Sequence, residues 1–498
     1  MGYVTHDLTL GDGVLTHGVG IAALEVRWIE NEPYVFAGAF SDGGITRLSL
    51  ASGRAEPEQE IFGTDRAGTT GLTDMAFVEV GGYDFLLAPG RHAEALALRV
   101  LRDDGSIGGL RDLDAPAPEM LRGWSQTTGF NAWGKDFLVA ARWDAPGLRI
   151  FEVGADYRLD PVARLEDGPK SPLGEVSALT TLELGGARYL AAASSAGSAV
   201  TTFRLEPGGA ALVDTIGAPV GVGWQGTQAM SAVEIAGTQF LVVGSTGTGT
   251  MSTLRINDHG VMFLADTALD DRTTRFDALV DLATFEHRGR SFVVAGGGDD
   301  GLSLFEIGPD GAFYHLETIA HRAGLALADV AALGAGVVDD VARIFTASDT
   351  EAGVSQFGVD MARFGELRLA GPGEDRLTGT GRDDHLQGGD GAVTLDGGGG
   401  ADRLVAGDGA TEMRGGAGAD AFVFRPDSGS ARIFDFEHGL DRLDLSAYPL
   451  LYSPDRLTIT ATDDGARIEA GDDVIDLHSA DGRPLAPEDF DVDDFIFG

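Results

Sequence analysis

Short apolar segments recur along residues 1–369 at a nearly constant spacing. Seven of them start 51 or 52 residues apart, each with a large apolar residue, at Tyr34, Phe85, Phe137, Tyr189, Phe240, Phe292 and Ile344. A second set of large apolar residues follows each start by 13 or 14 positions: Leu48, Leu98, Phe151, Phe203, Leu254, Phe305 and Phe357. The flanking residues alternate between apolar and polar, as in Leu302-Ser303-Leu304-Phe305. A period of two predicts half-buried strands rather than helices.

Turn signals and a further strand complete each repeat. Pairs such as Asp104-Gly105 and Asp310-Gly311 follow the second apolar segment on schedule, and an alternating strand such as Leu182-Glu183-Leu184 precedes the first. Each repeat therefore holds about four antiparallel strands, which is one blade of a β-propeller, and seven blades close into a ring. An open β-solenoid fits less well, because its coils are usually shorter and contain no hairpins.

The N-terminal segment 3–10 also alternates and precedes the first blade. It could pair into the last blade beside residues 365–369, which would remove the free edges of the ring, and the sequence leaves open which strand is outermost there.

A different pattern occupies residues 370–423, which divide into six nonapeptides in unbroken register. The eighth position is always apolar: Leu377, Leu386, Leu395, Leu404, Met413 and Phe422. The sixth position is aspartate in four of the six: Asp375, Asp384, Asp402 and Asp420. Glycine crowds the first four positions, where it allows left-handed turns, and aspartate supplies a hard oxygen ligand suited to Ca²⁺. A Gly-rich linker has no reason to keep the apolar period.

These nonads resemble the calcium-binding repeats of the RTX proteins that Gram-negative type I secretion exports. The segment from Ala419 through residues 433–436 to Ser446 resembles the usual exit from the RTX roll. The terminus Asp493-Asp494-Phe495-Ile496-Phe497-Gly498 is similar to the uncleaved export signal of the family. The resemblance implies a parallel β-roll in which one turn comprises two nonads, so that nonads of equal parity stack on one edge.

The resemblance also implies calcium ligands from position-six carboxylates and from carbonyls of the Gly-rich turns. Stacking would place Asp384, Asp402 and Asp420 in one unbroken column with two calcium sites, the first weakened because Arg382 replaces a glycine. The other edge would carry Asp375, Val393 and Thr411, and its sites would be weak or empty. The expected metal residues are Asp384, Asp402, Asp420, Gly381, Gly398, Gly400, Gly416, Gly418 and Asp375.

Residues 424–498 are less repetitive. Segments 457–461 and 466–470 flank Asp463-Asp464-Gly465 as a hairpin, and 473–477 reads as a third strand. We expect a β cap on the roll that continues into the secretion signal.

The composition limits the possible partners and the cellular location of the protein. The net charge of −42 makes nucleic acid an unlikely partner, since such a surface repels phosphate backbones. The chain has no cysteine, so its core or bound metal must stabilise it. No apolar stretch approaches the length of a membrane span, and residues 1–20 lack a signal-peptide pattern. Together with the C-terminal resemblance, this predicts type I export to the extracellular medium or the cell surface.

Catalytic signatures such as Gly-x-Ser-x-Gly and His-Glu-x-x-His are absent from the sequence. The propeller segments, for example 301–319, resemble seven-bladed lactonase-like propellers by pattern alone. Asp74, Asp277, Asp281 and Asp329 lie near the inner strands, where they would either hold a catalytic metal or cap backbone. Six loop acids would either ring one face as a cation-dependent rim or be solvated: Asp42, Asp144, Asp299, Asp300, Asp349 and Glu351. His315 and His321 are close in sequence and are more often solvated than metal-bound.

The sequence thus predicts an all-β chain with a seven-bladed β-propeller (1–369), a short calcium-binding parallel β-roll (370–423) and a β cap with the secretion signal (424–498). Two functions stay open. One is a secreted calcium-binding RTX protein whose propeller is a binding or structural module for an unknown extracellular ligand or surface. The other is an extracellular lactonase- or phosphoesterase-type hydrolase with a metal in the central tunnel, so whether the protein is an enzyme stays undecided.

Overall fold

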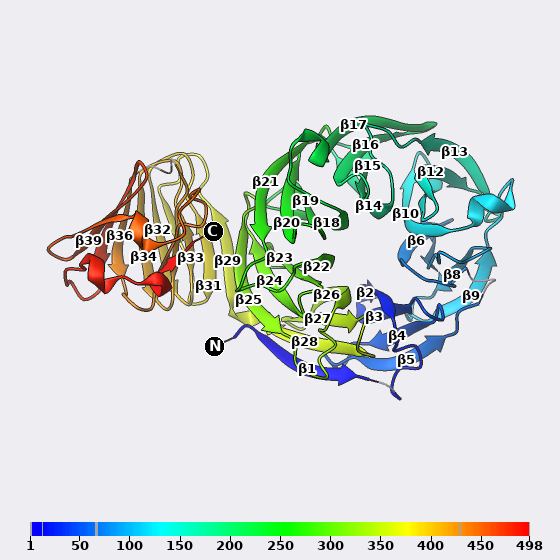
Figure 1. Cartoon of the computed structure of the whole chain (residues 1–498), viewed down its shortest axis with the longest axis horizontal. Coiled ribbons are helices and arrows are strands. Elements are labelled where there is room, and N and C mark those ends of the chain that lie inside the picture. The colour runs from blue at the N-terminus through cyan, green and yellow to red at the C-terminus, as the bar shows by residue number, and fades with distance from the viewer. Residues whose placement is uncertain (1, 12, 65–67, 427, 429, 498) are drawn as a thin grey trace. The chain divides into compact units, whose positions relative to one another are not determined.

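A computed structural model describes residues 2–11, 13–64, 68–426, 428 and 430–497 (Figure 1). The chain forms two compact units, residues 1–287 with 291–360 and residues 288–290 with 361–498. The first unit contains seven four-stranded sheets, and the second contains one six-stranded and one seven-stranded sheet. The fold is therefore an all-β propeller followed by a β-roll, as the two repeat lengths predict.

Each blade is an antiparallel sheet whose strands follow one another in sequence, except in the last blade. Blade 1 comprises β2 (Ile21–Ile29), β3 (Glu32–Ala39), β4 (Ile45–Ser49) and β5 (Glu56–Ile61). Blade 2 comprises β6 (Ala76–Val80), β7 (Tyr83–Leu87), β8 (Ala97–Leu101) and β9 (Ile107–Asp112). Blade 3 comprises β10 (Trp124–Ala132), β11 (Lys135–Arg142), β12 (Ala145–Val153) and β13 (Leu159–Leu165). Blade 4 comprises β14 (Val176–Leu184), β15 (Ala187–Ser194), β16 (Ala199–Glu206) and β17 (Gly209–Gly217).

The remaining blades continue the ring. Blade 5 comprises β18 (Thr227–Ile235), β19 (Thr238–Ser245), β20 (Thr250–Ile256) and β21 (Met262–Leu269). Blade 6 comprises β22 (Leu279–His287), β23 (Arg290–Gly297), β24 (Gly301–Ile307) and β25 (Phe313–Ala320). Blade 7 comprises β26 (Val330–Val338), β27 (Val341–Ser348), β28 (Val354–Asp360) and the N-terminal β1 (Val4–Leu10).

The recurrent apolar residues form the propeller core. The seven segments that start the pattern lie on the second strand of each blade, and the second set lies on the third strand. The two sets pair directly, for example Leu138 with Phe151 and Leu190 with Phe203, and these residues are almost fully buried. A spacing of 51 or 52 residues is therefore the length of one sheet with its turns.

The ring closes through the N-terminal strand, but not beside the expected residues. β1 pairs antiparallel with β28, from Val4 opposite Val359 to Leu10 opposite Val354, and the inner strands β2 and β26 lie side by side. Residues 365–369, the expected neighbours, instead form most of β29 (Phe364–Leu369), which belongs to the roll. The expectation was wrong because β28 already completes the inner three strands of blade 7.

The second unit is a parallel roll. One sheet has the order β29, β31 (Asp383–Gln387), β33 (Arg403–Val405), β35 (Ala421–Val423), β37 (Arg442–Asp444) and β41 (Phe495–Ile496). The other has the order β30 (Arg376–Thr378), β32 (Val393–Gly399), β34 (Thr411–Ala417), β36 (Ser430–Phe436), β40 (Asp473–Ser479), β39 (Gly465–Ala470) and β38 (Thr458–Ala461). Strand neighbours within the nonads are 18 residues apart, as in Leu377 opposite Leu395, so one turn comprises two nonads.

The roll extends beyond the nonads on both sides. It begins with β29, so the compact units divide near residue 360 rather than at 369/370. Strands β36, β37, β40 and β41 prolong both sheets past residue 423. Strands β38 and β39 form the expected hairpin, and β39 pairs with β40. The terminal segment ends as the last strand of a sheet, although its final residue, Gly498, lies outside the described residues.

Helical structure in the described residues is confined to short 3₁₀ turns. These are η2 (Pro118–Leu121), η3 (Ala218–Val220), η4 (Met361–Arg363), η5 (Pro454–Arg456), η6 (Pro487–Asp489) and η7 (Val492–Asp494). No helix in this part of the chain is long and apolar enough to cross a membrane.

Candidate metal centre

The second, fourth and sixth nonads, here called the even nonads, start at Gly379, Gly397 and Gly415. They build a column of buried carboxylates along one edge of the roll, which we call the even edge; the other edge is the odd edge. The backbone N–H of Asp384 donates to Oδ1 of Asp402 at 2.8 Å, and that of Asp402 donates to Oδ1 of Asp420 at 2.8 Å. The backbone N–H of Asp420 in turn donates to Oδ1 of Asp441 at 3.0 Å. All four side chains are at most 2% exposed. The hydrogen bonds therefore hold each carboxylate against the turn before it.

The hydrogen bonding of the second carboxylate oxygen, Oδ2, differs between the ends and the middle of the column. Oδ2 of Asp384 accepts from the N–H and the hydroxyl of Thr380, at 2.6 and 2.9 Å, and Oδ2 of Asp441 accepts from the N–H of Glu437 at 2.8 Å. Oδ2 of Asp402 and Oδ2 of Asp420 are buried and have no hydrogen-bond partner among the described residues. Two inward oxygens thus lack the donor that burial normally requires.

Glycine makes room for these two oxygens. A Cβ on Gly397 would lie 2.3 Å from Oδ2 of Asp402, and a Cβ on Gly415 would lie 2.3 Å from Oδ2 of Asp420. Any other residue at the first position of these nonads would therefore fill the space that faces each unpaired oxygen.

The electrostatics of the column oppose ionisation. Burial, together with the nearby carboxylates of Asp420 and Asp384, raises the pKa of Asp402 to about 8. Burial likewise raises the pKa of Asp420 to about 7 and that of Asp441 to about 6. Stacked carboxyls favour their neutral form unless a cation balances their charge.

The remaining expected glycines shape the same edge. Gly398, Gly400, Gly416 and Gly418 have φ values of 98°, 114°, 95° and 142°, a region that favours glycine. Successive turns stack so closely that a Cβ on Gly418 would lie 1.8 Å from the carbonyl oxygen of Gly400. Gly381 differs, because its Cβ would meet open space. Backbone carbonyls are therefore packed along the turns that carry Asp402 and Asp420.

The odd edge carries no comparable column. Asp375 is exposed, and the equivalent positions hold Val393 and Thr411, which are 4% and 2% exposed. Val393 packs into the core of the roll. The structure thus separates Asp375 from the other three expected carboxylates.

The donor set of the even edge fits calcium. Carboxylate and carbonyl oxygens are the ligands that Ca²⁺ prefers. Bound ions would be coordinated by the two oxygens that have no hydrogen-bond partner among the residues that the structure describes, Oδ2 of Asp402 and Oδ2 of Asp420. No three His, Asp or Glu side chains converge as a metal site in the described part of the chain, so backbone carbonyls would have to supply the remaining ligands.

The sequence pattern missed Asp441, the fourth carboxylate of the column. Its turn, residues 436–440, has one glycine in place of the Gly-rich run, so the nonad register is lost there. The signal that remains is Asp441-Arg442-Leu443, which repeats the Asp-x-Leu spacing of Asp402-Arg403-Leu404.

The four acids expected near the propeller tunnel do not form one site. Asp74 accepts from the N–H of Thr127 at 2.8 Å, and Asp281 accepts from the N–H of Leu333 at 2.8 Å, so each joins two neighbouring blades. Burial raises the pKa of Asp74 to about 6 and that of Asp281 to about 7. Asp277 and Asp329 are exposed.

An acid that the sequence pattern did not single out lies near the first two. Desolvation on the inner strand β2 raises the pKa of Glu25 to about 7, against the lowering effect of Arg27, and the charges of Asp74 and Asp281 add to the rise. The alternation Leu24-Glu25-Val26 was the available signal, since it places an acid on the face of the strand opposite to two apolar residues.

Most of the loop acids on the expected rim already have partners. These pairs are Asp42 with His17 at 2.7 Å, Asp144 with Arg142 at 2.8 Å, Asp299 with Arg275 at 3.4 Å, Asp300 with the N–H of Asp329 at 3.1 Å, and Glu351 with His321 at 3.7 Å. Asp349 is exposed. The pairing favours ordinary loop acids over a cation-dependent rim.

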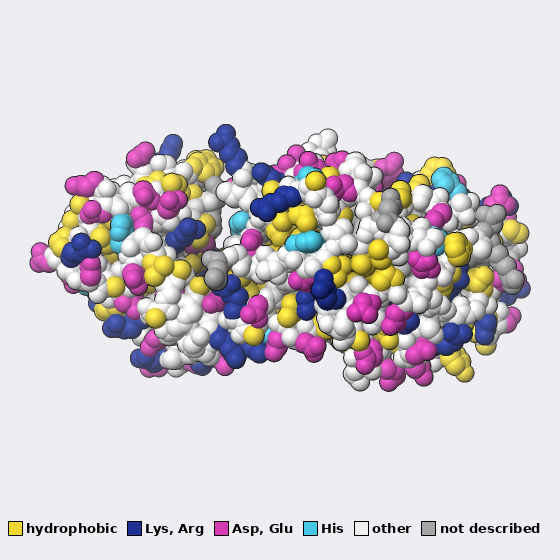
Figure 2. Space-filling view, turned by 90° about the horizontal axis from the view of Figure 1, so that it is seen from below, with side chains coloured by type: hydrophobic (Ala, Val, Ile, Leu, Met, Phe, Trp, Pro, Cys, Tyr) yellow, Lys and Arg dark blue, Asp and Glu magenta, His cyan; other side chains and the backbone are white. Residues whose placement is uncertain are grey.

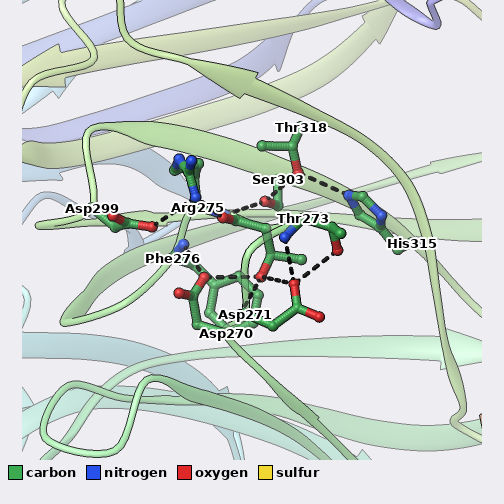
Figure 3. Close-up of polar contacts among 10 residues, drawn as sticks. Asp270, Asp271, Thr273, Arg275, Phe276, Asp299, Ser303, His315 and Thr318 are labelled. Atoms are coloured by element: carbon green, nitrogen blue, oxygen red, sulfur yellow. Dashed lines mark hydrogen bonds and ion pairs between the residues drawn. The ribbon is translucent and has the colours of Figure 1, made fainter. Parts of the chain in front are cut away.

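His315 belongs to a hydroxyl network rather than to a pair with His321. Its Nε2 lies 2.8 Å from the hydroxyl of Thr318, which contacts that of Ser303 at 2.8 Å (Figure 3). Blade 7 repeats the arrangement at 3.0 and 2.7 Å with His6, Thr9 and Ser355. A network that recurs between the outer strands of two blades is a structural feature of the repeat.

Several solved structures are similar to part of the chain. The chain is similar to the structure of a putative 6-phosphogluconolactonase from Bacteroides uniformis, with 13% identity over 60% of this chain and 85% of that one and a TM-score of 0.43. A periplasmic gluconolactonase from Pseudomonas aeruginosa gives 17% identity over 60% and 85%, with a TM-score of 0.47. A Lactobacillus plantarum protein gives 15% over 62% and 87%, with a TM-score of 0.47.

The repeats themselves give the sequence match. No curated protein matches the chain. The sequence profile of the RTX calcium-binding nonapeptide repeat matches residues 378–413 and 396–423, the segment that carries Asp384, Asp402 and Asp420. The chain therefore joins a seven-bladed propeller to RTX calcium-binding nonapeptide repeats.

Proposed function

We propose that the protein is a secreted calcium-binding protein whose roll is completed by calcium and whose propeller is an extracellular binding module. The observation that carries this proposal is the pair of buried oxygens, Oδ2 of Asp402 and Oδ2 of Asp420, which have no partner among the described residues. Calcium bound there would neutralise the stacked charge and supply the missing coordination.

Two ions would be held at the centre of the even edge. Asp402 and Asp420 would each direct Oδ2 to an ion, while Oδ1 keeps the hydrogen bond that positions the carboxylate. Carbonyls of the Gly398–Gly400 and Gly416–Gly418 turns would complete the sites. Asp384 would contribute less than its sequence position suggests, because Thr380 already occupies its Oδ2.

Binding would be coupled to folding. Because the column is destabilised by its own charge at neutral pH, the free energy of calcium binding becomes free energy of folding of the roll. We expect dissociation constants on the order of 10⁻⁴ to 10⁻³ M, the range of extracellular calcium modules. The roll would then be unstable in the low calcium of a cell and stable outside.

Calcium titration of the full chain tests this function. Hydrogen exchange of residues 379–423 should slow as calcium rises through the millimolar range, and Asp402→Ala should remove much of the effect, because one of the two ions is lost. Asp375→Ala is the matched control, since it removes the exposed aspartate of the same repeat position from the odd edge. Equal loss in the two variants would contradict the assignment of calcium to the even edge.

We further propose export by a type I secretion system, on the strength of the RTX repeats and of the acidic-to-aromatic segment 493–497. Removing about the last fifty residues should keep the protein inside a host that exports the full chain. Normal appearance of the truncated chain in the medium would contradict export through this segment.

An extracellular hydrolase that works in the tunnel is the second candidate. It draws on Glu25, whose pKa of about 7 beside Asp74 and Asp281 suits proton transfer at neutral pH. Turnover of sugar lactones or phosphoesters by the full chain, abolished in Glu25→Gln, would favour it. If the wild-type chain binds calcium and turns over none of these substrates, the hydrolase is excluded and the binding module remains as the function of the propeller.

A further inference from the structure

A groove of about 500 Å³ opens on the propeller where the hairpin ends of blades 3 and 4 meet. Trp133 and Asn131 line it from the β10–β11 hairpin of blade 3, and Glu183, Arg188, Arg204 and Glu206 line it from blade 4. The volume lies in the range of small-molecule sites. An aromatic ring on one side and four charged side chains on the other make the groove chemically two-sided.

The backbone holds Trp133 in a conformation that a bulky residue rarely adopts. Its φ is 54° and that of Gly134 is 72°, the signature of a two-residue turn that normally favours Asn-Gly or Gly-Gly. The neighbouring blades use Gly81-Gly82 and Gly185-Gly186 in the equivalent turns. Blades 1, 5, 6 and 7 place Glu30, Ala236, Arg288 and Asp339 at the same position with φ values of 47–52°, so the turn accepts a side chain and presents that of Trp133 at the end of the hairpin.

The ring is both rigid and accessible. Trp133 packs edge-on against Phe130 and Phe137, with ring centroids 6.4 and 5.7 Å apart, and these two phenylalanines stack on each other at 4.8 Å. The residue nevertheless remains 48% exposed. Its packing therefore fixes the indole while part of the ring stays available to a ligand.

The opposite wall supplies forked hydrogen-bonding groups. Glu183 and Arg188 face each other across β14 and β15, and their charged groups are 3.5 Å apart. Arg204 is exposed, and no ion pair is found for it among the residues that the structure describes, although aspartate and glutamate total 78 in the chain. The groove is locally balanced in charge, with two arginines and two glutamates, inside a protein of net charge −42.

We propose that this groove binds a pyranose ring of an extracellular polysaccharide. The apolar C–H face of a sugar stacks on an exposed indole, and its neighbouring hydroxyls or a carboxylate match the planar donors of Arg204 and the Glu183–Arg188 pair. A local balance of charge accepts a neutral sugar or a uronic acid, whereas the net charge of the whole protein disfavours a polyanion such as nucleic acid. The inference rests on the proposed role of the propeller as a binding module.

An array of neutral and uronic-acid oligosaccharides, probed with the full chain, tests the inference. We expect selective binding, followed in solution by quenching of tryptophan fluorescence. Trp133→Gly should weaken binding by about tenfold or more, because the stacking surface is lost, while the melting temperature stays unchanged or rises because glycine suits the turn. Trp28→Ala is the matched control, since Trp28 is 46% exposed and does not line the groove.

The sugar class is read from a second variant. Arg204→Gln should weaken binding of uronic acids more than that of neutral sugars if a carboxylate occupies the site, and both alike if hydroxyls do. Unchanged affinity in Trp133→Gly, or no bound glycan on the array, would overturn the inference. Calcium-induced protection of residues 379–423, measured on the same preparation, separates this failure from failure of the proposed calcium function.

Discussion

Replacing Asp402 by asparagine should stabilise the calcium-free roll at pH 8 and weaken its response to calcium, because only the ion at Asp420 would remain. Asparagine keeps the Oδ1 acceptor for the N–H of Asp384 and replaces the unpaired oxygen by a neutral amide. In the wild type, the pKa of Asp402 is raised from 3.8 to about 8, so the folded roll binds a proton that the unfolded chain releases above pH 4. Stability is therefore fully present below pH 4 and falls as the pH rises towards 8.

The size of the effect follows from the pKa values. Each unit corresponds to ~1.4 kcal/mol, and Asp420, with a pKa of about 7, titrates in the same window. After a discount for solvent screening and for the coupling of the two groups, ionisation of the pair should remove on the order of 5 kcal/mol from the calcium-free roll. That loss is comparable with the whole stability of a small domain. Asp402→Asn should restore roughly half of it.

Amide hydrogen exchange of the full chain measures the change in stability at the carboxylate column itself. The amides of Asp384 and Asp402 donate to the carboxylate column, so their protection reports local opening of the even edge. Without calcium, wild-type protection should fall between pH 5 and pH 8 after correction for intrinsic exchange, and the variant should fall much less. Asp375→Asn should behave as wild type. Lower protection in Asp402→Asn than in the wild type at pH 8 would refute the reasoning.

Three further substitutions and one control variant test polar contacts and packing. Asp441→Ala removes the acceptor of two backbone N–H groups from a residue 2% exposed, so it should destabilise the last turns by about 2–4 kcal/mol in thermal unfolding. Gly400→Ala should lower the melting temperature of the calcium-loaded roll sharply, because φ is 114° and a Cβ would lie 2.3 Å from backbone, whereas Gly381→Ala should change it little. Asp7→Ala leaves the partly buried Arg343 without its carboxylate and should cost the propeller about 2–3 kcal/mol by calorimetry; no loss would show that this ion pair does not hold β1.

The sequence predicted the parts of the fold that a period can encode. A period of two within a repeat of 51 or 52 residues led to seven blades, and a period of nine led to a roll with an 18-residue turn. Both follow because apolar residues must face a core at every repeat. The parity argument likewise placed Asp384, Asp402 and Asp420 in one column, as the register of β31, β33 and β35 shows.

The sequence could not predict features that depend on which strand completes a sheet. Residues 364–369 alternate like an outer blade strand, yet β1 takes that place and β29 starts the roll. Hydrogen bonding without a period was equally hidden. Thr380 donates to Asp384, and Asp441 joins the column from a turn that keeps only one glycine.

Acidic and basic side chains are interspersed on the face seen in Figure 2. The carboxylates that the roll stacks along one edge are buried, so the mixed surface charge does not reveal them. Backbone hydrogen bonds to Oδ1 hold the carboxylates of Asp402 and Asp420 in register, one per turn, and burial then penalises their ionisation. The same geometry that makes the calcium-free edge unstable at neutral pH arranges the ligands for an ion. An ordinary salt bridge at this place would have satisfied the oxygens permanently. If calcium binds the unpaired oxygens as proposed, the fold of the roll depends on calcium, which is the property that the proposed export before folding requires.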